Sequence, residues 1–112
     1  TASTGEILFG SSADNDAGRV IYDHSNDTLS WYTDSNVRLL IDSSGNVGIG
    51  TSSPNAAAIL DVQSTTKGIR FPNMTTTQKN TMADVAGMQV FDTTLGKMCF
   101  NTGSAWETIT SS

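Results

Sequence analysis

Short apolar runs separated by polar turns fill the first half of the chain. Their centres recur about every nine residues, near Ile21, Ser30, Leu40 and Gly48, and strands spaced roughly 8–12 residues apart are typical of an all-β architecture. The breaks between the later runs, DHSND, DSN and DSSGN, consist of turn formers, whose side chains bond the nearby backbone and tolerate left-handed conformations. The runs themselves are EILFG, RVIY, TLSWYT, VRLLI and NVGIG.

The apolar residues in these runs do not alternate cleanly with polar ones. VIY at 20–22 and LLI at 39–41 are consecutive. A strand exposed on one side shows a period of two, whereas consecutive apolar residues indicate that both sides are covered. We therefore expect one face of this sheet to be covered by another chain.

Pro54 suggests a boundary between two parts of the chain, 1–54 and 55–112. Proline has no backbone donor, so the stretch TSSPNAAA does not continue a strand ladder. After it, the sequence predicts a strand over 59–62, a turn, and a short strand that ends at Pro72.

The stretch TTTQKNTMADVAG, residues 75–87, is the one segment with helical character. A threonine at position 75 or 76 would cap this helix, and Gly87 would end it. Its short apolar stripe would consist of Met82 and Val85.

The last quarter predicts a three-stranded meander formed by MQVFDT, KMCFN and AWETIT. Apolar residues at Met88, Val90, Met98 and Phe100 follow a period of two, as half-buried antiparallel strands require. The pattern as a whole predicts a mainly β chain, in which short strands are followed by a small β-meander module with one short helix.

Composition points to a polar but weakly charged surface. The 112 residues include 16 Thr and 14 Ser, and only 15% are charged, against about 25% in an average domain. The net charge is −5, and the six basic residues form no patch, so we expect no nucleic-acid partner. No apolar run is long enough for membrane insertion. Leu, Ile, Val and Phe total 23 residues, a thin core that favours association with copies of the same chain.

The stretch GNVGIGTSSP has the glycine content of a phosphate-binding loop but not its spacing. A dinucleotide site needs G-x-G-x-x-G before a helix, and a Walker loop needs Gly-Lys-Ser/Thr. Neither pattern is present, so we expect no nucleotide cofactor. Glycine lets backbones approach closely, and the candidate contacts between neighbouring subunits are therefore Val47, Gly48, Ile49 and Gly50.

Other residues with reactive or metal-binding side chains lack the partners that a catalytic or metal site requires. DNDAG, residues 14–18, has two carboxylates as calcium loops do, but position twelve of such a loop would be Ser25 instead of glutamate. His24 lies beside Asp23 in a turn-forming stretch, without further ligands or a nucleophile. Cys99 is the only cysteine, which suits a buried apolar side chain. We expect no metal, no cofactor and no catalytic residue.

Three aromatic residues are candidates for receptor or sugar binding, because flat rings in an Asn- and Thr-rich surface suit neutral carbohydrate. The competing interpretation is packing, which dominates the energetics of Trp and Tyr. The candidates are Trp31, Tyr32 and Trp106.

Three segments together resemble a known family. RLLIDSSGNVGIGTSSP, residues 38–54, resembles a segment of tail fibres and other adhesive fibres of bacteriophages. STTKGIRFPNMTTTQKNTM and GMQVFDTTLGKMCFNTGSAWETI are similar to the part that follows it in those fibres. Asn73 stands where arginine is usual in the family, and Ile69 where phenylalanine is common.

The resemblance implies an intertwined, β-rich homotrimer at the end of a virion tail or head fibre. Its partners would be two copies of itself and a host cell-surface receptor, of glycan type, and the protein would be extracellular and non-enzymatic. The alternative is a carbohydrate-binding module of a secreted polysaccharide-active protein, monomeric with an exposed aromatic row. A hydrolase would need paired carboxylates, yet the only glutamates, Glu6 and Glu107, are far apart in sequence.

Overall fold

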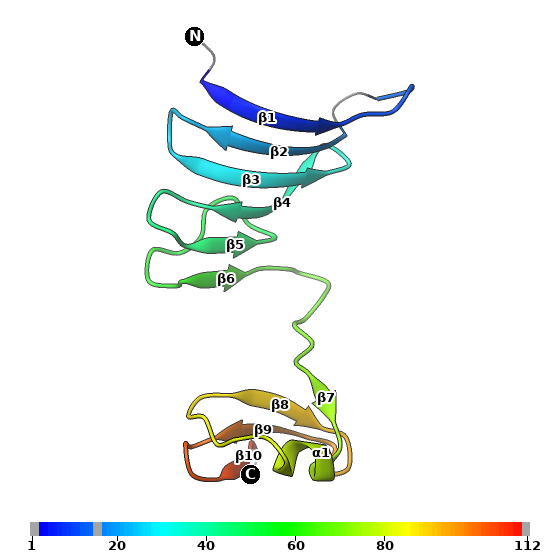
Figure 1. Cartoon of the computed structure of the whole chain (residues 1–112), viewed down its shortest axis with the longest axis vertical. Coiled ribbons are helices and arrows are strands. Elements are labelled where there is room, and N and C mark those ends of the chain that lie inside the picture. The colour runs from blue at the N-terminus through cyan, green and yellow to red at the C-terminus, as the bar shows by residue number, and fades with distance from the viewer. Residues whose placement is uncertain (1–2, 15–16, 111–112) are drawn as a thin grey trace. The chain divides into compact units, whose positions relative to one another are not determined.

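A computed structural model describes residues 3–14 and 17–110, and it is mainly β, as predicted. The contacts divide the chain between Lys67 and Gly68 into an N-terminal module and a C-terminal module. Each module contains one sheet, and the single α-helix of the described residues belongs to the C-terminal module (Figure 1). The candidate calcium stretch at residues 14–18 includes positions 15 and 16, which lie outside the described residues.

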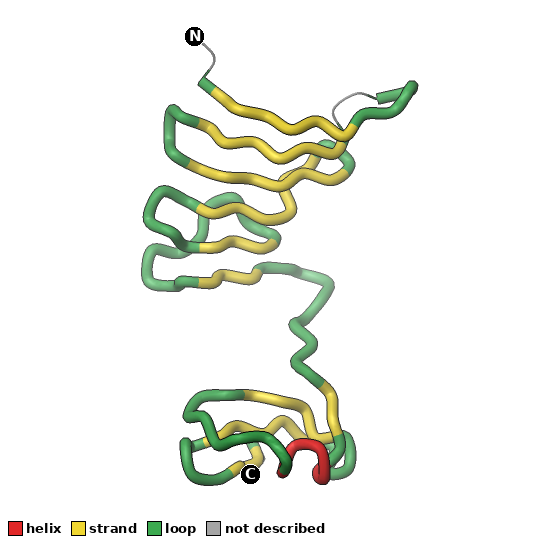
Figure 2. Tube along the Cα trace, viewed as in Figure 1, coloured by secondary structure: helices red, strands yellow, loops and turns green. Residues whose placement is uncertain are grey.

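The N-terminal module is a six-stranded sheet with the strands in sequence order. Neighbouring strands are antiparallel up to β5, and β6 then pairs with β5 in parallel (Figures 1 and 2). The strands are β1 (Thr4–Phe9), β2 (Gly18–Asp23), β3 (Thr28–Thr33), β4 (Asn36–Ile41), β5 (Val47–Ile49) and β6 (Leu60–Val62).

Turn chemistry explains where these strands end. Asp34 and Ser35 both have positive φ, 48° and 58°, which is the geometry of the two-residue hairpin turn that matches strand twist. Before β5, the Asp42 carboxylate accepts hydrogen bonds from the backbone amides of Ser44 and Asn46, each at 3.0 Å. These are the polar breaks that the sequence predicts as turns.

The chain after Pro54 stays with the N-terminal sheet, because it turns back and adds β6 beside β5. The Val47 amide donates to the Ile59 carbonyl at 2.8 Å, and the Asn55 amide donates to the Asp61 carboxylate at 2.8 Å. The sequence suggests a boundary at Pro54, whereas the contacts divide the chain thirteen residues later, after Lys67. Proline ends the strand, but the loop it starts remains part of the same sheet.

The C-terminal module is a four-stranded sheet in the order β10-β9-β8-β7. The β7–β8 pair is parallel and the other pairs are antiparallel, so the predicted meander of three strands is present with one short strand added at its edge. Its elements are β7 (Asn73–Met74), α1 (Thr76–Asn80), β8 (Gln89–Asp92), β9 (Lys97–Asn101) and β10 (Trp106–Thr108).

The helix α1 begins where the sequence predicts but is much shorter. Thr75 caps it: its hydroxyl accepts from the Gln78 amide, and the Gln78 side chain accepts from the Thr75 amide. The predicted helix over 75–87 is wrong beyond Asn80, since residues 83–86 are irregular. The Asp84 carboxylate accepts a hydrogen bond from the Asn101 side chain at 2.9 Å, which holds this segment against β9 instead.

Buried apolar side chains are few in both modules. Among the described residues, the fully buried hydrophobic side chains are Leu40, Val90 and Cys99. Large apolar side chains such as Ile7, Phe9 and Leu60 are more than half exposed. A sheet normally buries its apolar face against a second layer. If the exposed apolar side chains gather on one face, that face lacks such a layer.

Candidate subunit-association site

The strand register sorts the side chains of the N-terminal sheet into two different faces. Residues paired directly across a ladder project to the same face. On one face, the pairings define two rows across all six strands. The first row is Ile7, Val20, Trp31, Leu39, Ile49 and Val62, and the second is Gly5, Tyr22, Leu29, Ile41, Val47 and Leu60. We call these two rows, with Phe9, the apolar face.

The opposite face, which we call the polar face, carries the charged strand residues Glu6, Arg19, Asp23 and Asp61. Its central row runs from Glu6 through Ile21, Ser30 and Leu40 to Gly48 and ends at Asp61. Ser30 and Leu40 are each only 6% exposed there. The consecutive apolar residues 20–22 and 39–41 therefore do serve two faces, with four of the six on the apolar face.

The apolar face remains largely open within its own module. In the described part of the N-terminal module every strand belongs to the one sheet, so no second sheet covers this face. The exposed fractions of Ile7, Phe9 and Leu60 are 60%, 64% and 54%. A hollow of about 240 Å³ lies over Gly5, where a side chain is missing from the second row, with Ile7, Val20, Tyr22 and Leu29 in its wall.

Two glycines of GNVGIG, Gly48 and Gly50, make close contacts within the chain. Gly48 is on the polar face, where an added Cβ would lie 2.6 Å from the Thr51 carbonyl oxygen and 3.1 Å from Pro54 Cγ. Gly50 has a φ of +74° and packs its Cα against the Gln63 carbonyl. Of the four predicted subunit contacts, Val47 and Ile49 are the two whose side chains project from the apolar face. Their contact with a partner stays a prediction.

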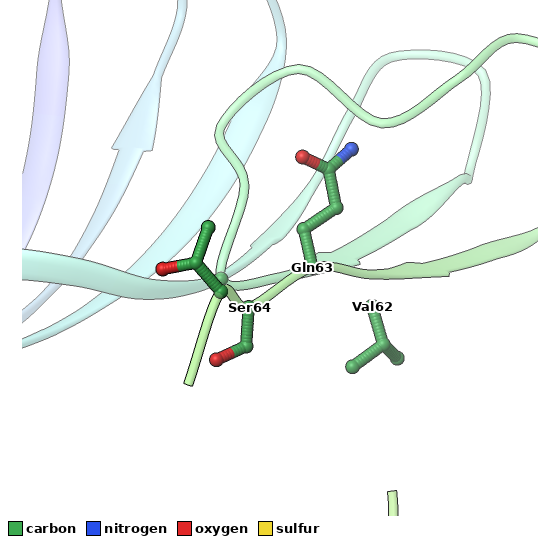
Figure 3. A pocket seen from close by; sticks show the side chains of 5 residues that line it. Val62, Gln63 and Ser64 are labelled. Carbon is green, nitrogen blue, oxygen red and sulfur yellow. The ribbon is translucent and has the colours of Figure 1, made fainter. Parts of the chain in front are cut away.

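A second hollow, of about 650 Å³, lies beside Gly50 and is lined by Val62, Gln63, Ser64 and Thr65. Figure 3 shows Val62 and Ser64 pointing to one side of the chain and Gln63 to the other, the alternation of extended backbone. The lining residues carry no titratable group, and the hollow is therefore unsuited to acid–base chemistry.

The C-terminal sheet also has one covered and one open face. Val90 and Cys99 pair across β8 and β9 and are buried on the side that α1 covers. Phe91 and Met98 pair on the other side. They line a hollow of about 230 Å³ together with Ile69, Arg70, Phe71 and Asn73, of which Ile69 is 58% exposed.

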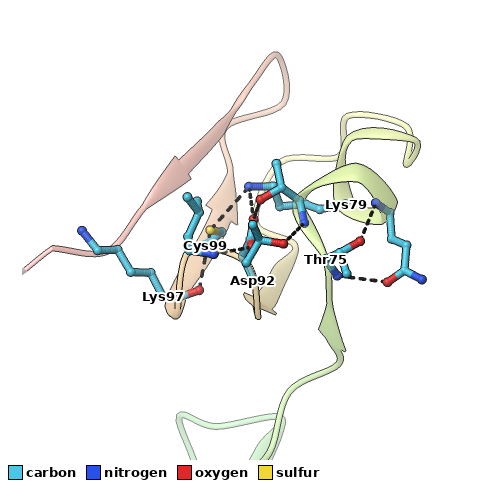
Figure 4. Close-up of polar contacts among 9 residues, drawn as sticks. Thr75, Lys79, Asp92, Lys97 and Cys99 are labelled. Carbon is cyan, nitrogen blue, oxygen red and sulfur yellow. Dashed lines mark hydrogen bonds and ion pairs between the residues drawn. The ribbon is translucent and has the colours of Figure 1, made fainter.

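A buried ion pair forms the centre of the covered face (Figure 4). Lys79 Nζ lies 2.9 Å from Asp92 Oδ2, and the two side chains are almost fully shielded from solvent. The Thr76 hydroxyl donates to Asp92 at 2.7 Å and the Leu95 amide donates to it at 2.9 Å. Lys79 also lies 3.7 Å from the Cys99 sulfur. Every charged atom of the pair thus has a protein partner.

This environment lowers the pKa of Asp92 and raises the pKa of Lys79, so both shifts favour the charged forms. Burial alone would raise the pKa of Asp92, but the hydrogen bonds from Leu95, Thr76 and Lys79 outweigh it and lower the pKa to about 2. The hydrogen bond to Asp92 raises the pKa of Lys79 against the opposing effect of burial. Sequence reasoning missed this pair, and the one available signal was an Asp at the start of the DTTLG turn.

A model of the family described as phage tail like trimerisation region matches residues 48–112. The chain belongs to this family. The match contains the last two residues of β5, all of β6 and the entire C-terminal module, so this phage tail like trimerisation region includes Ile49, Leu60 and Val62 of the apolar face as well as Phe91 and Met98. No curated protein and no solved structure matches the chain.

The aromatic candidates Trp31 and Tyr32 lie on opposite faces of the N-terminal sheet. Trp31 is on the apolar face between Val20 and Leu39. Tyr32 is on the polar face, where the Arg19 guanidinium lies 4.4 Å from its ring. Trp106 belongs to the C-terminal module, with Lys79 Nζ 5.9 Å from its ring. This arrangement favours packing roles for the three rings.

In the described part of the chain, the predicted candidate His24 is not part of a metal-binding cluster. The His24 ring packs against the Tyr22 ring at 4.9 Å, and residues 3–14 and 17–110 contain no group of three potential metal ligands. Among the same residues, none of the helical structure has the length and apolarity needed to cross a bilayer.

Proposed function

We propose that this chain is a structural segment of a virion fibre that assembles as a homotrimer and presents a host-binding surface, without catalytic activity. The observation that carries this proposal is that each sheet has an open apolar face, and that the C-terminal sheet lies entirely within the matched trimerisation region. Burying apolar surface contributes about 25 cal/mol per Å², so copies that cover these faces gain stability that a single chain lacks.

The open face of the C-terminal sheet lies entirely within the residues that the family model matches. Ile69 is 58% exposed in the hollow beside Phe91, so a charge at position 69 disturbs an isolated chain very little. In a trimer that covers this hollow, the same charge would be desolvated at considerable cost. We therefore expect Ile69→Asp to weaken association by roughly tenfold or more, which corresponds to about 1.4 kcal/mol.

Light scattering coupled to size exclusion at micromolar concentration tests the assembly. The expected result is a mass of three chains for the unaltered protein. Leu95→Asp is the matched control, because Leu95 is 48% exposed in the β8–β9 turn, away from the hollow. A monomeric mass for the unaltered protein would refute the proposal, and equal weakening by both substitutions would refute the role of this face.

The host-binding half of the proposal concerns the outer surface. A surface rich in Thr and Ser with 15% charged residues offers hydroxyl and backbone hydrogen bonds, which suit a neutral glycan better than a polyanion. A glycan array probed with the trimer tests this, with the expectation that neutral oligosaccharides bind. Binding only to sulfated or otherwise anionic glycans would contradict the proposed receptor chemistry.

The proposed absence of catalysis is supported by the burial of Lys79 and Asp92, whose pKa values are shifted. Lys79 and Asp92 are enclosed and neutralise one another, so neither is available to a substrate in solution. Hydrolysis of host polysaccharide by the purified trimer would overturn this part.

A further inference from the structure

We propose that the apolar face of the N-terminal sheet is itself a subunit interface, packed against the same face of two further copies. This inference rests on the proposed homotrimer. It extends the association surface beyond residues 48–112 to β1, β2, β3 and β4, which lie outside the family match.

Charge is segregated between the two faces of this sheet. The two rows and Phe9 carry no charge, whereas the polar face holds Glu6, Arg19, Asp23 and Asp61. Arg38 lies at the irregular pairing of β3 with β4, where its Nε donates to the Thr33 hydroxyl at 2.8 Å. A sheet with solvent on both sides has no reason to separate its side chains in this way. A sheet that packs one face against another surface requires it.

The apolar face is also continuous with the family match. Ile49 and Val62 lie inside the trimerisation region, and they are the last two members of the row that begins at Ile7. The strands between them are joined by regular hydrogen-bonded pairing, with one irregularity between Trp31 and Tyr32. If copies meet at Ile49 and Val62, the rest of the row is the direct continuation of that contact along the same side of the sheet.

The size and relief of the apolar face suit an interface. Its five most exposed side chains, which are between 37% and 64% exposed, contribute roughly 500 Å² if each offers about 200 Å² in full. Stable interfaces bury about 800 Å² per partner, and the half-buried members of both rows supply the rest. The hollow of about 240 Å³ over Gly5 gives a partner's side chain a place to insert. The five are Ile7, Phe9, Tyr22, Ile49 and Leu60.

Two adjacent residues of β1 provide a matched test. Ile7 on the apolar face is 60% exposed, and Leu8 on the polar face is 51% exposed. In an isolated chain, Ile7→Asp and Leu8→Asp should have similar and small effects. In the proposed assembly, only Ile7→Asp places a carboxylate, once per subunit, in a desolvated interface.

The experiment uses the full chain with Trp106→Phe, which leaves Trp31 as the only tryptophan and as a reporter at the middle of the row. Acrylamide quenching of Trp31 and amide hydrogen exchange in β2 and β3 are compared at equal chain concentration. We expect Ile7→Asp to raise both the quenching of Trp31 and the amide exchange. A decrease of about 1.4 kcal/mol in the free energy of opening the face would raise the exchange roughly tenfold. Leu8→Asp should change neither.

The outcomes separate this inference from the proposed function. A trimeric mass with Trp31 equally protected in both variants would overturn the interface on the apolar face and leave the homotrimer intact. Strong quenching of Trp31 in the unaltered trimer would overturn it as well. A monomeric mass would defeat the proposed function itself. A dimeric mass would defeat both the proposed homotrimer and the packing of three copies.

Discussion

Two glycines that flank β5 allow a steric cost to be separated from a conformational one. Gly45 has a φ of +83° and open space around the position of an added Cβ. Gly50 has a φ of +74°, and its added Cβ would collide with the Gln63 carbonyl. Alanine at either position adopts an unfavourable left-handed backbone, but only Gly50→Ala also pushes two backbone segments apart.

The expected losses follow from this difference. Left-handed backbone costs an L-residue roughly 1–2 kcal/mol, and reduced freedom of the unfolded chain returns about 0.4–1 kcal/mol. Gly45→Ala should therefore destabilise by about 1 kcal/mol. Gly50→Ala should add an overpacking cost of about 1–3 kcal/mol, because the displaced Gln63 amide donates to the Ile49 carbonyl at 2.9 Å and joins β6 to β5.

Urea unfolding followed by circular dichroism measures both variants against the unaltered protein. Chain concentration is held equal, because the stability of an associating protein depends on it. The close approach of β5 to the chain after β6 would be refuted if the two substitutions cost the same to within about 0.5 kcal/mol. A larger loss for Gly45→Ala would refute the steric ranking altogether.

Two further predictions concern the C-terminal module. Because the pKa of Asp92 is lowered to about 2 in the folded chain, its carboxylate contributes stability above the ordinary value of 3.8, and the contribution disappears as the pH falls from there toward 2. Asp92→Asn should flatten the acid branch of the unfolding curve in that interval, and an unchanged branch would contradict the shift. Thr75→Ala removes the cap of α1 and should cost about 0.5–2 kcal/mol in thermal unfolding. Thr77→Ala, at an exposed helix position, should cost clearly less, and an equal cost would argue against the capping box.

The strands and turns of this chain were predictable because their determinants are local. Asp34 and Ser35 fit a tight hairpin turn by residue type, and Asp42 organises the next turn through its own carboxylate. The cap of α1 is local as well, and the structure selects Thr75 from the two candidates. Such features depend on residues within a few positions of one another.

The assignment of faces was not predictable, because it depends on register. In the sequence, Leu39 and Leu40 are equivalent apolar neighbours. Pairing with Trp31 and Ile49 puts Leu39 on the apolar face, whereas Leu40 pairs with Ser30 and Gly48 and is buried on the other side. Without the pairing, the sequence indicates only that both faces contain apolar residues.

Contacts between distant residues limited the rest of the prediction. Lys79 and Asp92 meet only because α1 folds onto β8, and the helical tendency of residues 81–87 yields to the bond between Asp84 and Asn101. The parallel pairing of β6 is similar, since a proline followed by NAAA gives no sign of a return to the same sheet. Each of these outcomes is decided by tertiary contacts stronger than the local preference.

The sequential strand order of the N-terminal sheet has an evolutionary consequence. Each antiparallel strand lies beside its neighbour in the sequence, so inserting or deleting one hairpin leaves every other ladder unchanged. One such event would lengthen or shorten the sheet by two strand spacings of about 4.8 Å each. Duplication of a short gene segment could thus adjust the reach of this part of the protein in fixed steps, with no redesign of the remaining pairings.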